Sequence, residues 1–497
     1  MVRGSASASS ALSPWGRWDY VATLVVSAAL FAYVATHRMV DDDEGFYALA
    51  GRAVVEGKTP YFDFFFPQMP LTAVVYGVTR KLAGPGLVPL RALGAVLAVG
   101  TTLLVHHAAR RLAGRRAALL AAGLFVAHTL AWEWSVVVKT YPLALLFATA
   151  ALVAATARSP STRTELASGL LAGLAVASRL LSAPVLVGVL LPLLSRRPRT
   201  RSIVAMTGGV ALALAPVVWL ALRDFGTFGF DVLLFHGIRS PGDGLVKDPL
   251  QKLDVVRQLF LSPLGTHRPD VTGIQTLALV FTSIFGVRAL VRSVRFETAR
   301  ALAPWFAAGL ALLLAGLAAS PTWVQYGVAG VPCLAVVAGV VVSELARHPA
   351  QAVIPVVSYA ALAVASFRDR IVEADADLRP DVVDSVGRAL DDATPPGLDV
   401  GAHFPPYLVA STRGIVPAAE NQYARLFSDR VPASRRARLH LFDEAELRAE
   451  LLSPRTGGFV VGAFVVPETA LAVKDAGFVR ARDLPGATVW VRPARTP

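Results

Sequence analysis

The sequence has little cysteine and little charge. One cysteine, Cys333, is present among 497 residues, and it lies inside an apolar run. A single thiol excludes an intramolecular disulfide and a cluster of thiolate metal ligands. Charged residues make up 17% of the chain, whereas hydrophobic residues make up 54%. This composition excludes an ordinary soluble globular protein.

The sequence also lacks an internal repeat, and low complexity is confined to its Ser/Ala-rich start. The formal net charge of +13 does not indicate nucleic-acid binding, because the arginines form short clusters between apolar runs. The positive-inside rule produces that placement in membrane proteins. Arginine greatly outnumbers lysine and alanine is abundant, which is typical of a bacterial genome rich in G and C.

Long apolar runs are what the sequence has in abundance. Each is long enough, or nearly so, to cross a hydrocarbon core of about 30 Å. The first run is longer than a signal-peptide core and no small-x-small cleavage site follows it, which favours an uncleaved span. The eleven predicted spans are 20–36, 88–109, 116–131, 141–157, 166–181, 182–195, 203–222, 273–292, 300–318, 322–343 and 351–367.

Basic residues fall in every second loop between these runs. By the positive-inside rule these loops are cytoplasmic, together with residues 1–19. This topology requires that the apolar segment 70–82 does not cross, and its thirteen residues suit a helix lying along the membrane interface. The basic loops are Arg110–Arg116, Arg158–Arg163, Arg196–Arg201, Arg292–Arg300 and the loop at Arg347.

The predicted domains follow from this topology. Residues 20–367 form a polytopic α-helical membrane domain with two larger extracytoplasmic loops, 38–87 and 223–272. Residues 368–497 regain charge and Pro/Gly punctuation, and about 125 residues suffice for a small extracytoplasmic α/β domain. In that tail we predict strands at 459–466 and 487–491 and an amphipathic helix at 442–452. The expected location is a plasma membrane.

Four carboxylates, Asp41–Glu44, follow the first span directly. Like charges at a membrane boundary are unfavourable unless they are solvated, paired or functional. The pattern Asp43-Glu44-x-x-Tyr47 begins a predicted helix that runs to Glu56, and an acidic start also suits the helix dipole. We expect Asp43 to be functional, Glu44 to cap or position the helix, and Asp41 and Asp42 to be solvated charge.

Aromatic residues crowd the second half of the first outer loop. At headgroup depth they would form an interfacial aromatic belt or line an entry groove for a lipid. Both interpretations remain open from the sequence. The residues concerned are Tyr61, Phe62, Phe64, Phe65 and Phe66.

The order of these motifs resembles a known family. A membrane span is followed by Asp-Glu-x-x-Tyr, then by Gly-x-x-Pro-Tyr-x-Asp and a Pro-Leu helix start. This order is similar to that of the polyprenyl-phosphate-dependent (GT-C) membrane glycosyltransferases, in the branch of protein mannosyltransferases and lipid A aminoarabinose transferases. The likeness covers roughly residues 20–345 and is strongest over 40–120. It rests on Asp43–Tyr47, Gly57–Asp63, Pro70-Leu71, Leu90-Arg91, Arg110–Arg116, Gly169–Arg179, and Tyr326 with Pro332.

The resemblance implies a GT-C-like fold and transfer of a sugar from a polyprenyl-phosphate-linked donor outside the cytoplasm. It also places an acidic residue of the first loop near the reacting centre, and Asp43 matches that position. A carboxylate there suits a general base on the acceptor hydroxyl. Arginine suits the departing lipid phosphate. The implied partners are the lipid-linked donor, a glycan, lipid or protein acceptor, and membrane lipids, without nucleic acid.

The chain departs from the family pattern at two positions. Gln68-Met69-Pro70 stands where relatives often have Lys-Pro, so a phosphate-facing cation is missing. At the outer start of the fourth span, Lys139 stands where relatives often have an aspartate. We hypothesise that Lys139 replaces the cation and that Glu133 partly replaces the acid. A cofactor is not identified by the sequence. An acidic cluster can bind Mg²⁺ or Mn²⁺, but the missing aspartate argues against a metal.

Ten further residues are candidates for donor or acceptor contacts. Arg179 either snorkels to the interface or binds phosphate, because an unpaired charge in an apolar stretch is disfavoured. A lone loop histidine such as His236 is more often simply solvated. The set comprises Glu44, Tyr47, Tyr61, Asp63, Gln68, Lys139, Arg179, His236, Arg239 and Tyr326.

Two other classes of function remain as alternatives. A secondary transporter also has many spans, but it typically shows two related halves and interrupted midplane helices, and the sequence shows neither. A non-catalytic protein of envelope polysaccharide assembly would use the tail for binding. In that case the Phe404–Tyr407 segment would contact glycan or protein, although Pro-Pro-Tyr is more typical of a turn.

Overall fold

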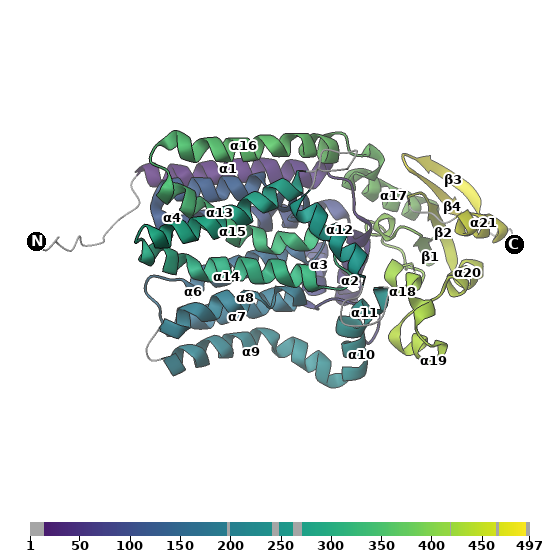
Figure 1. The fold of residues 1–497 in the computed structure, drawn as a ribbon. Coiled ribbons are helices and arrows are strands. Elements are labelled where there is room, and N and C mark those ends of the chain that lie inside the picture. Colours follow the sequence, from purple (N-terminus) through teal and green to yellow (C-terminus); the bar gives the residue numbers. More distant parts are fainter. Residues whose placement is uncertain are drawn as a thin grey trace, which may run out of the picture.

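We describe the protein from a computed structural model, which covers residues 14–195, 199–240, 248–261, 271–417, 419–463 and 467–493. Most of the predicted cytoplasmic start, the pair Arg196-Arg197 and the end of the strand expected at 459–466 lie outside these residues. Figure 1 shows long helices running roughly side by side, with a small domain of strands and short helices at the end away from the N terminus.

Within the described residues, a helix forms at each predicted span. The two predicted spans within 88–131 correspond to α4, which consists of two helical halves joined by a kink at Ala113 and Gly114. Gly114 has φ of 81°, which residues with a side chain rarely adopt. The helices are α1 (Pro14–His37), α4 (Leu87–Ala127), α6 (Tyr141–Ala155), α7 (Thr162–Ser178), α8 (Val185–Leu190), α9 (Arg199–Arg223), α13 (Thr272–Arg292), α14 (Phe296–Ala318), α15 (Val331–Leu345) and α16 (Pro349–Phe367).

Length and composition separate these helices into two groups. Seven helical segments of the described chain are long and apolar enough to cross a membrane, namely those at 17–37, 87–127, 199–223, 272–292, 296–318, 324–345 and 349–372. Shorter apolar helices lie at 141–155 and 180–194. The protein is therefore a membrane protein with a mostly helical fold, and the count of eleven crossings stays a prediction.

The two ends of the bundle differ in charge. The connections α6–α7, α13–α14 and α15–α16, which carry basic residues, lie at the end nearest the N terminus (Figure 1). Both ends of α4 lie at the other end, because Arg91 near its start and Trp134 just beyond it both contact Arg38. The break at Ala113 and Gly114, in the middle of α4, therefore lies at the end nearest the N terminus, and with it the basic loop Arg110–Arg116. These basic loops thus share one end of the bundle, as the alternation in the sequence predicts.

Short helices cover the opposite end. They are α2 (Asp42–Val55), α3 (Leu71–Ala83), α5 (Thr129–Trp134), α10 (Phe225–Gly229), α11 (Phe235–Arg239) and α12 (Pro249–Phe260). The helices predicted at 43–56 and 70–82 thus form as α2 and α3. They cross closely, since a Cβ on Gly51 would stand 2.7 Å from the backbone nitrogen of Gly77.

The C-terminal domain is built on a four-stranded sheet of order β1-β2-β4-β3, in which β1 and β2 are parallel and the other pairs antiparallel. The strand predicted at 487–491 and the helix predicted at 442–452 are confirmed by β4 and α20. The strand predicted at 459–466 is confirmed only in part, because β2 covers Thr456–Val461 and the described residues Gly462 and Ala463 are not in a strand. The elements are α17 (Pro380–Ala393), β1 (Asp399–Ala402), α18 (Gln422–Leu426), α19 (Ala433–Arg436), α20 (Glu444–Leu452), β2 (Thr456–Val461), α21 (Pro467–Asp475), β3 (Val479–Leu484) and β4 (Ala487–Val491).

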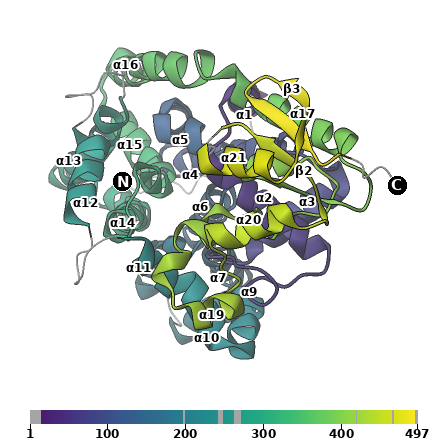
Figure 2. The ribbon, with the colours of Figure 1, turned by 90° about the vertical axis from the view of Figure 1, so that its right-hand side faces the viewer.

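This domain lies across the outer short helices, as Figure 2 shows. Arg52 of α2 donates to the backbone oxygens of Ser411 and Arg413, and Asp384 of α17 accepts from the first amides of α4, at 2.8 Å from the nitrogen of Leu87. Pro405–Leu408 form a buried turn of 3₁₀ helix that packs on α2. The turn that Pro-Pro-Tyr favours is therefore present, and the alternative, a contact of this segment with glycan or protein, is wrong because its side chains are buried within the protein.

The aromatic residues of the first outer loop are buried. Tyr61, Phe64, Phe65 and Phe66 are at most 4% exposed. They pack with α2, with the segment 228–235 and with residues of the C-terminal domain such as Leu441. Both interpretations from the sequence, an interfacial belt and a lipid groove, are wrong for these four residues. The covering domain, far away in the sequence, removes them from lipid and water.

Candidate active site

A cavity of about 400 Å³ opens where α2, the bundle and the C-terminal domain meet. Its lining comes from seven separate parts of the chain. The lining residues are Asp41, Asp42, Asp43, Phe46, Tyr47, Pro67, Gln68, Lys139, Tyr141, Arg179, Arg239, Trp323, Gln325, Tyr326 and Tyr423. The cavity therefore collects residues from the whole length of the chain, and its chemistry depends on how they are arranged.

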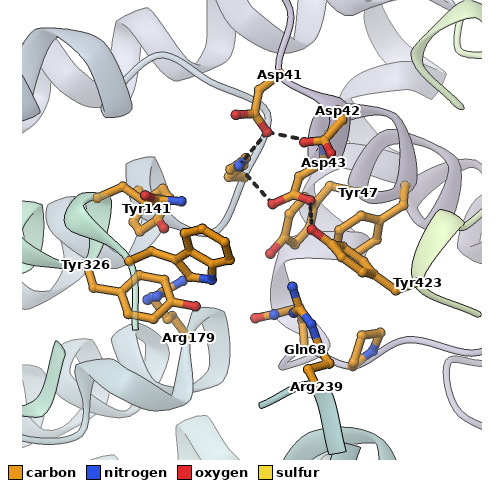
Figure 3. A pocket seen from close by; sticks show the side chains of 15 residues that line it. Asp41, Asp42, Asp43, Tyr47, Gln68, Tyr141, Arg179, Arg239, Tyr326 and Tyr423 are labelled. Carbon is orange, nitrogen blue, oxygen red and sulfur yellow. Dashed lines mark hydrogen bonds and ion pairs between the residues drawn. The ribbon is translucent and has the colours of Figure 1, made fainter. Parts of the chain in front are cut away.

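The acidic end of the cavity is the first turn of α2. Asp41 is the N-cap, and its side chain accepts from the backbone nitrogen of Asp43 while Glu44 accepts from the backbone nitrogen of Asp41. This reciprocal capping box fixes the start of the helix. As a result, Asp42 and Asp43 follow in the first turn with their carboxylates facing the cavity (Figure 3).

Lys139 neutralises part of this acidic turn. Its Nζ atom lies 2.5 Å from Asp41 and 2.8 Å from Asp43. Tyr76 holds the Lys139 backbone by donating to its oxygen, and the ammonium also lies over the ring of Trp134. Burial alone would lower the pKa of Lys139, but the two carboxylates outweigh it and raise the pKa well above its usual value. Lys139 is therefore a permanent cation of the site.

Asp41 and Asp42 are perturbed in opposite directions. Burial works against ionisation of Asp41, yet the adjacent Lys139 ammonium lowers its pKa to about 2. Burial raises the pKa of Asp42 to about 7, with further contributions from the negative charges of Asp43 and Asp41. The expectation that both are solvated charge is wrong, because the first turn of α2 packs against Lys139 and the cavity wall.

Glu44 serves a different purpose from its neighbours. It is fully buried, accepts from Arg91 Nε at 2.8 Å and from the backbone nitrogen of Val138 at 2.9 Å, and is not among the described residues that line the cavity. Arg91 also donates to the backbone oxygens of Arg38 and Met39 at the end of α1. The pair thus ties α1, α2 and α4 together, in agreement with the positioning role expected for Glu44.

Two arginines form the opposite end of the cavity, beside Gln68 (Figure 3). Arg179 is 7% exposed, donates to the hydroxyl of Thr140 at 2.9 Å and lies between the rings of Tyr141 and Tyr326. Arg239 lies 4.1 Å from the ring centre of Tyr423. Within the described chain, neither arginine forms an ion pair with a carboxylate. Their charges remain available to an anion.

The predicted residues separate into three groups. Asp43, Tyr47, Gln68, Lys139, Arg179, Arg239 and Tyr326 line this cavity together. Tyr61 and Asp63 are not among its described lining residues: Tyr61 donates to the backbone oxygen of Gln68, and Asp63 accepts from the backbone of Thr59 in a tight turn. Glu133 pairs with Arg370 instead of lining the cavity. The structure therefore gives Tyr61, Asp63 and Glu133 supporting contacts.

A second cavity of about 210 Å³ adjoins the first and shares Gln68, Arg179 and Tyr326 with it. His236 borders this cavity, where its Nε2 lies 3.0 Å from the backbone oxygen of Pro67. Burial, together with the nearby Arg239, lowers the pKa of His236 to about 4, so the ring is neutral near pH 7. The remaining lining is largely apolar and comprises Leu180, Leu181, Val232, Leu233, Ala319, Ser320 and Pro321.

The sequence analysis missed several lining residues. Trp323 and Gln325 lie just before the predicted Tyr326, and Tyr141 lies two residues after the predicted Lys139, so closeness to these candidates in the sequence was the available signal. Tyr423 gave no signal, because nothing in the tail sequence relates it to the first outer loop.

The three aspartates also bear on metal binding. Their carboxylate oxygens lie within 4.8 Å of one another, and hard oxygen ligands suit Mg²⁺ or Mn²⁺. The Lys139 ammonium, however, already contacts Asp41 and Asp43. A divalent ion would compete with that charge for the same oxygens. The donor set therefore fits a metal only in part.

Comparison with known proteins gives a consistent fold. Residues 67–221 match the model of the dolichyl-phosphate-mannose–protein mannosyltransferase family. The structure of ArnT from Cupriavidus metallidurans bound to undecaprenyl phosphate is similar with a TM-score of 0.66 at 16% identity, covering 97% of this chain and 99% of that chain. No curated protein matches the sequence significantly.

Two more distant structures share the fold. The Archaeoglobus fulgidus oligosaccharyltransferase has a TM-score of 0.51 at 14% identity, over 91% of this chain and 70% of that one. The mycobacterial arabinofuranosyltransferase AftD has 0.53 at 16% identity, over 98% of this chain and 40% of that one. The GT-C-like fold that the sequence predicts is thereby confirmed, and the structural likeness to ArnT covers 97% of this chain, the C-terminal domain included.

Proposed function

We propose that the protein transfers a sugar from a polyprenyl-phosphate-linked donor to an acceptor hydroxyl on the extracytoplasmic face of a plasma membrane. The observation that carries this proposal is the division of one cavity into a carboxylate end and an arginine end. A sugar between them would meet a base on one side and cations for a leaving phosphate on the other. The undecaprenyl phosphate bound by the similar ArnT structure supports this class of donor.

In the proposed step, the acceptor oxygen bonds to the anomeric carbon of the sugar while the bond from that carbon to the phosphate oxygen breaks. The bonding pair leaves with the polyprenyl phosphate monoester, and the acceptor proton passes to the carboxylate of Asp43. Arg179 and Arg239 stabilise the charge that develops on the phosphate, because guanidinium binds phosphate oxygens through directed, charge-assisted hydrogen bonds.

The second cavity suits the lipid part of the donor. Arg179 lines both cavities, so a phosphate at Arg179 has the first cavity on one side and the second on the other. Leu180 and Leu233 of the second cavity are 39% and 52% exposed, which is consistent with a surface that faces membrane lipid. The polyprenyl chain would therefore leave the site between Leu180 and Leu233.

The charge of the bundle supports the orientation. Basic loops gather at the end away from the cavity, and cytoplasmic loops of membrane proteins carry an excess of Lys and Arg. We therefore place the cavity and the C-terminal domain outside the cytoplasm of a bacterial cell. The acceptor hydroxyl belongs to a glycan, a lipid or a protein.

The test separates donor binding from transfer in the purified full-length protein. Transfer is followed with radiolabelled undecaprenyl-phosphate-mannose and acceptor fractions from a membrane extract, and binding through thermal stabilisation by undecaprenyl phosphate. We expect Asp43→Asn to lower transfer by about 100-fold or more while undecaprenyl phosphate still binds. Arg179→Met is expected to weaken that binding, because it removes a phosphate ligand.

Arg223→Met is the matched control. Arg223 also stacks on two rings, those of Phe62 and Trp219, but is not among the described residues lining either cavity, so its removal is expected to preserve binding and transfer. Near-normal transfer by Asp43→Asn would contradict the role of Asp43. Equal stabilisation by undecaprenyl phosphate and by undecaprenol, which lacks the phosphate, would contradict the donor class. Phosphate-specific binding without mannose transfer would indicate a different sugar.

A further inference from the structure

Tyr423 is the one residue that the described C-terminal domain contributes to the lining of the first cavity. It lies in α18, whose N-cap Asn421 accepts from the backbone nitrogen of Tyr423 at 2.9 Å. The Asn421 amide also donates to the backbone oxygen of Phe65 in the first outer loop. Phe442 holds the other side of α18 by donating to the backbone oxygen of Ala424. The position of Tyr423 is therefore fixed from both sides.

Tyr423 reaches both ends of the cavity (Figure 3). Its hydroxyl donates to Oδ1 of Asp43, and its ring faces the guanidinium of Arg239 at 4.1 Å. Phe46 of α2 meets the same ring edge-on at 5.5 Å between ring centres. Burial, and next to it the charge of Asp43, raises the pKa of Tyr423 above its usual value, so the phenol keeps its proton and remains a donor.

The two oxygens of Asp43 are held by different donors. Tyr423 binds Oδ1, and Lys139 binds Oδ2 at 2.8 Å. A carboxylate has about four acceptor positions, so each oxygen retains one for a further donor such as an acceptor hydroxyl. With both oxygens anchored, the plane of the carboxylate is fixed. Proton transfer is sensitive to this orientation.

We propose that Tyr423 is a positioning residue of the transfer site: its hydroxyl orients Asp43, and its ring holds Arg239 toward the donor phosphate. The inference rests on the proposed function and deepens it. It makes the C-terminal domain a part of the site that couples the base to the phosphate ligand. The acidic and cationic ends are then set by one side chain from a domain outside the helix bundle.

Two substitutions separate the two contacts of Tyr423. Tyr423→Phe removes the hydroxyl and keeps the ring, so we expect kcat to fall about tenfold or more with the donor KM nearly unchanged. Tyr423→Leu also removes the ring, and we expect the same loss of kcat together with a donor KM raised roughly two- to tenfold. The full-length protein is assayed with undecaprenyl-phosphate-mannose.

Tyr407→Phe is the control. Tyr407 is a buried tyrosine of the same domain whose hydroxyl donates to the backbone oxygen of Gly486, away from the cavity. It is expected to leave both kinetic constants unchanged. If Tyr423 had only a structural role, the two variants would not differ in this way, with kcat alone changed in Tyr423→Phe and both kcat and the donor KM changed in Tyr423→Leu. Wild-type kcat in Tyr423→Phe would overturn the proposal.

A second measurement keeps the inference distinct from the proposed function. If wild-type protein transfers no sugar from this donor, thermal stabilisation by undecaprenyl phosphate still tests the contact with Arg239. We then expect Tyr423→Phe to be stabilised like wild type and Tyr423→Leu to be stabilised less. Equal stabilisation of the two variants would overturn the inference, whereas absence of phosphate-specific binding in the wild type would overturn the proposed function.

Discussion

Lys139 carries a single positive charge beside the three aspartates that open α2. It contacts Asp41 and Asp43, and Asp42 instead hydrogen-bonds to Asp41 (Figure 3). Asp42 is therefore the aspartate whose negative charge is least balanced by a cation. Its pKa rises to about 7 through burial and through the negative charges of Asp43 and Asp41. At neutral pH, Asp42 and Asp41 accordingly hold a proton between them for part of the time.

The raised pKa of Asp42 predicts a pH-dependent stability. The ordinary pKa of 3.8 applies to the unfolded chain, so folding favours the protonated form. That contribution is complete below 3.8 and is lost as the pH rises toward 7. Asn cannot ionise and has a similar shape. We expect Asp42→Asn to unfold at a higher temperature than wild type at pH 8, with the difference shrinking toward pH 5.

Thermal unfolding in detergent at pH 5, 6, 7 and 8 measures this difference. Asp41 and Asp43 face Asp42 along α2, and Lys139 faces that turn from the segment before α6, so these charges are the same in both proteins. A constant difference between the variant and wild type across this range would contradict the assignment of the perturbed proton to Asp42.

The helix α2 is held at close range on two sides. Gly45 faces the 3₁₀ turn of the C-terminal domain, where a Cβ would stand 2.3 Å from the backbone nitrogen of Pro406. Gly51 faces α3 in the same way at Gly77. Backbone atoms cannot move aside as flexible side chains do. These two glycines therefore set the depth of α2, and with it the position of Asp43.

Gly45→Ala tests this packing. Replacing glycine by alanine in a helix usually stabilises it, but overpacking against backbone costs about 1–3 kcal/mol. We expect Gly45→Ala to lower the unfolding temperature and to reduce sugar transfer. Gly208→Ala in α9 is the control, since a Cβ at Gly208 meets nothing within 4 Å. It is expected to leave the unfolding temperature unchanged or slightly higher. Equal behaviour of the two variants would contradict close packing at Gly45.

The C-terminal domain forms part of the core of the whole molecule. Phe64 and Phe66 of the first outer loop share an apolar cluster with Leu408 and Val460 of the domain. Arg52 and Arg80 donate to backbone oxygens in the segment 409–413. Removing the domain would expose these aromatic rings and leave both arginines without these acceptors. Separating the C-terminal domain from the helix bundle and its first outer loop is therefore unfavourable.

Deletion of residues 371–497 tests this dependence. We expect the truncated chain to aggregate or to be degraded when it is expressed, and to transfer no sugar, because the cavity loses Tyr423 and the outer loop loses its cover. Size-exclusion chromatography in detergent and the transfer assay measure the two effects. A monodisperse truncated protein that retains transfer would make the domain an accessory module.

Apolar runs and basic loops were sufficient to predict the helical architecture, because both signals are local. A run such as 203–222 must bury its surface in lipid or protein wherever the chain goes, and α9 forms there. The short segment 70–82 was likewise placed by its length and became α3. Local reasoning failed for the aromatic loop, since Phe65 and Phe66 looked accessible until the C-terminal domain covered them.

The sequence predicted several residues of the candidate site but not the contacts between them. Asp43, Lys139 and Arg179 stood out because charge beside an apolar run is costly without a function or a partner. Partners, however, could not be assigned: Glu44 looked like a site residue and instead binds the buried Arg91. Asp41 and Asp42 looked solvated and instead border the cavity.

A membrane helix bundle with a charged C-terminal domain follows from the amino-acid sequence alone, because hydrophobicity and charge act on each segment independently. Which residues meet depends on the three-dimensional packing. Tyr423 and Asp43 are 380 residues apart and share a hydrogen bond. Arg179 and Arg239 face the same cavity from different helices. Such convergence depends on the packing of distant segments, and no pattern in the sequence around one of these residues indicates its partner.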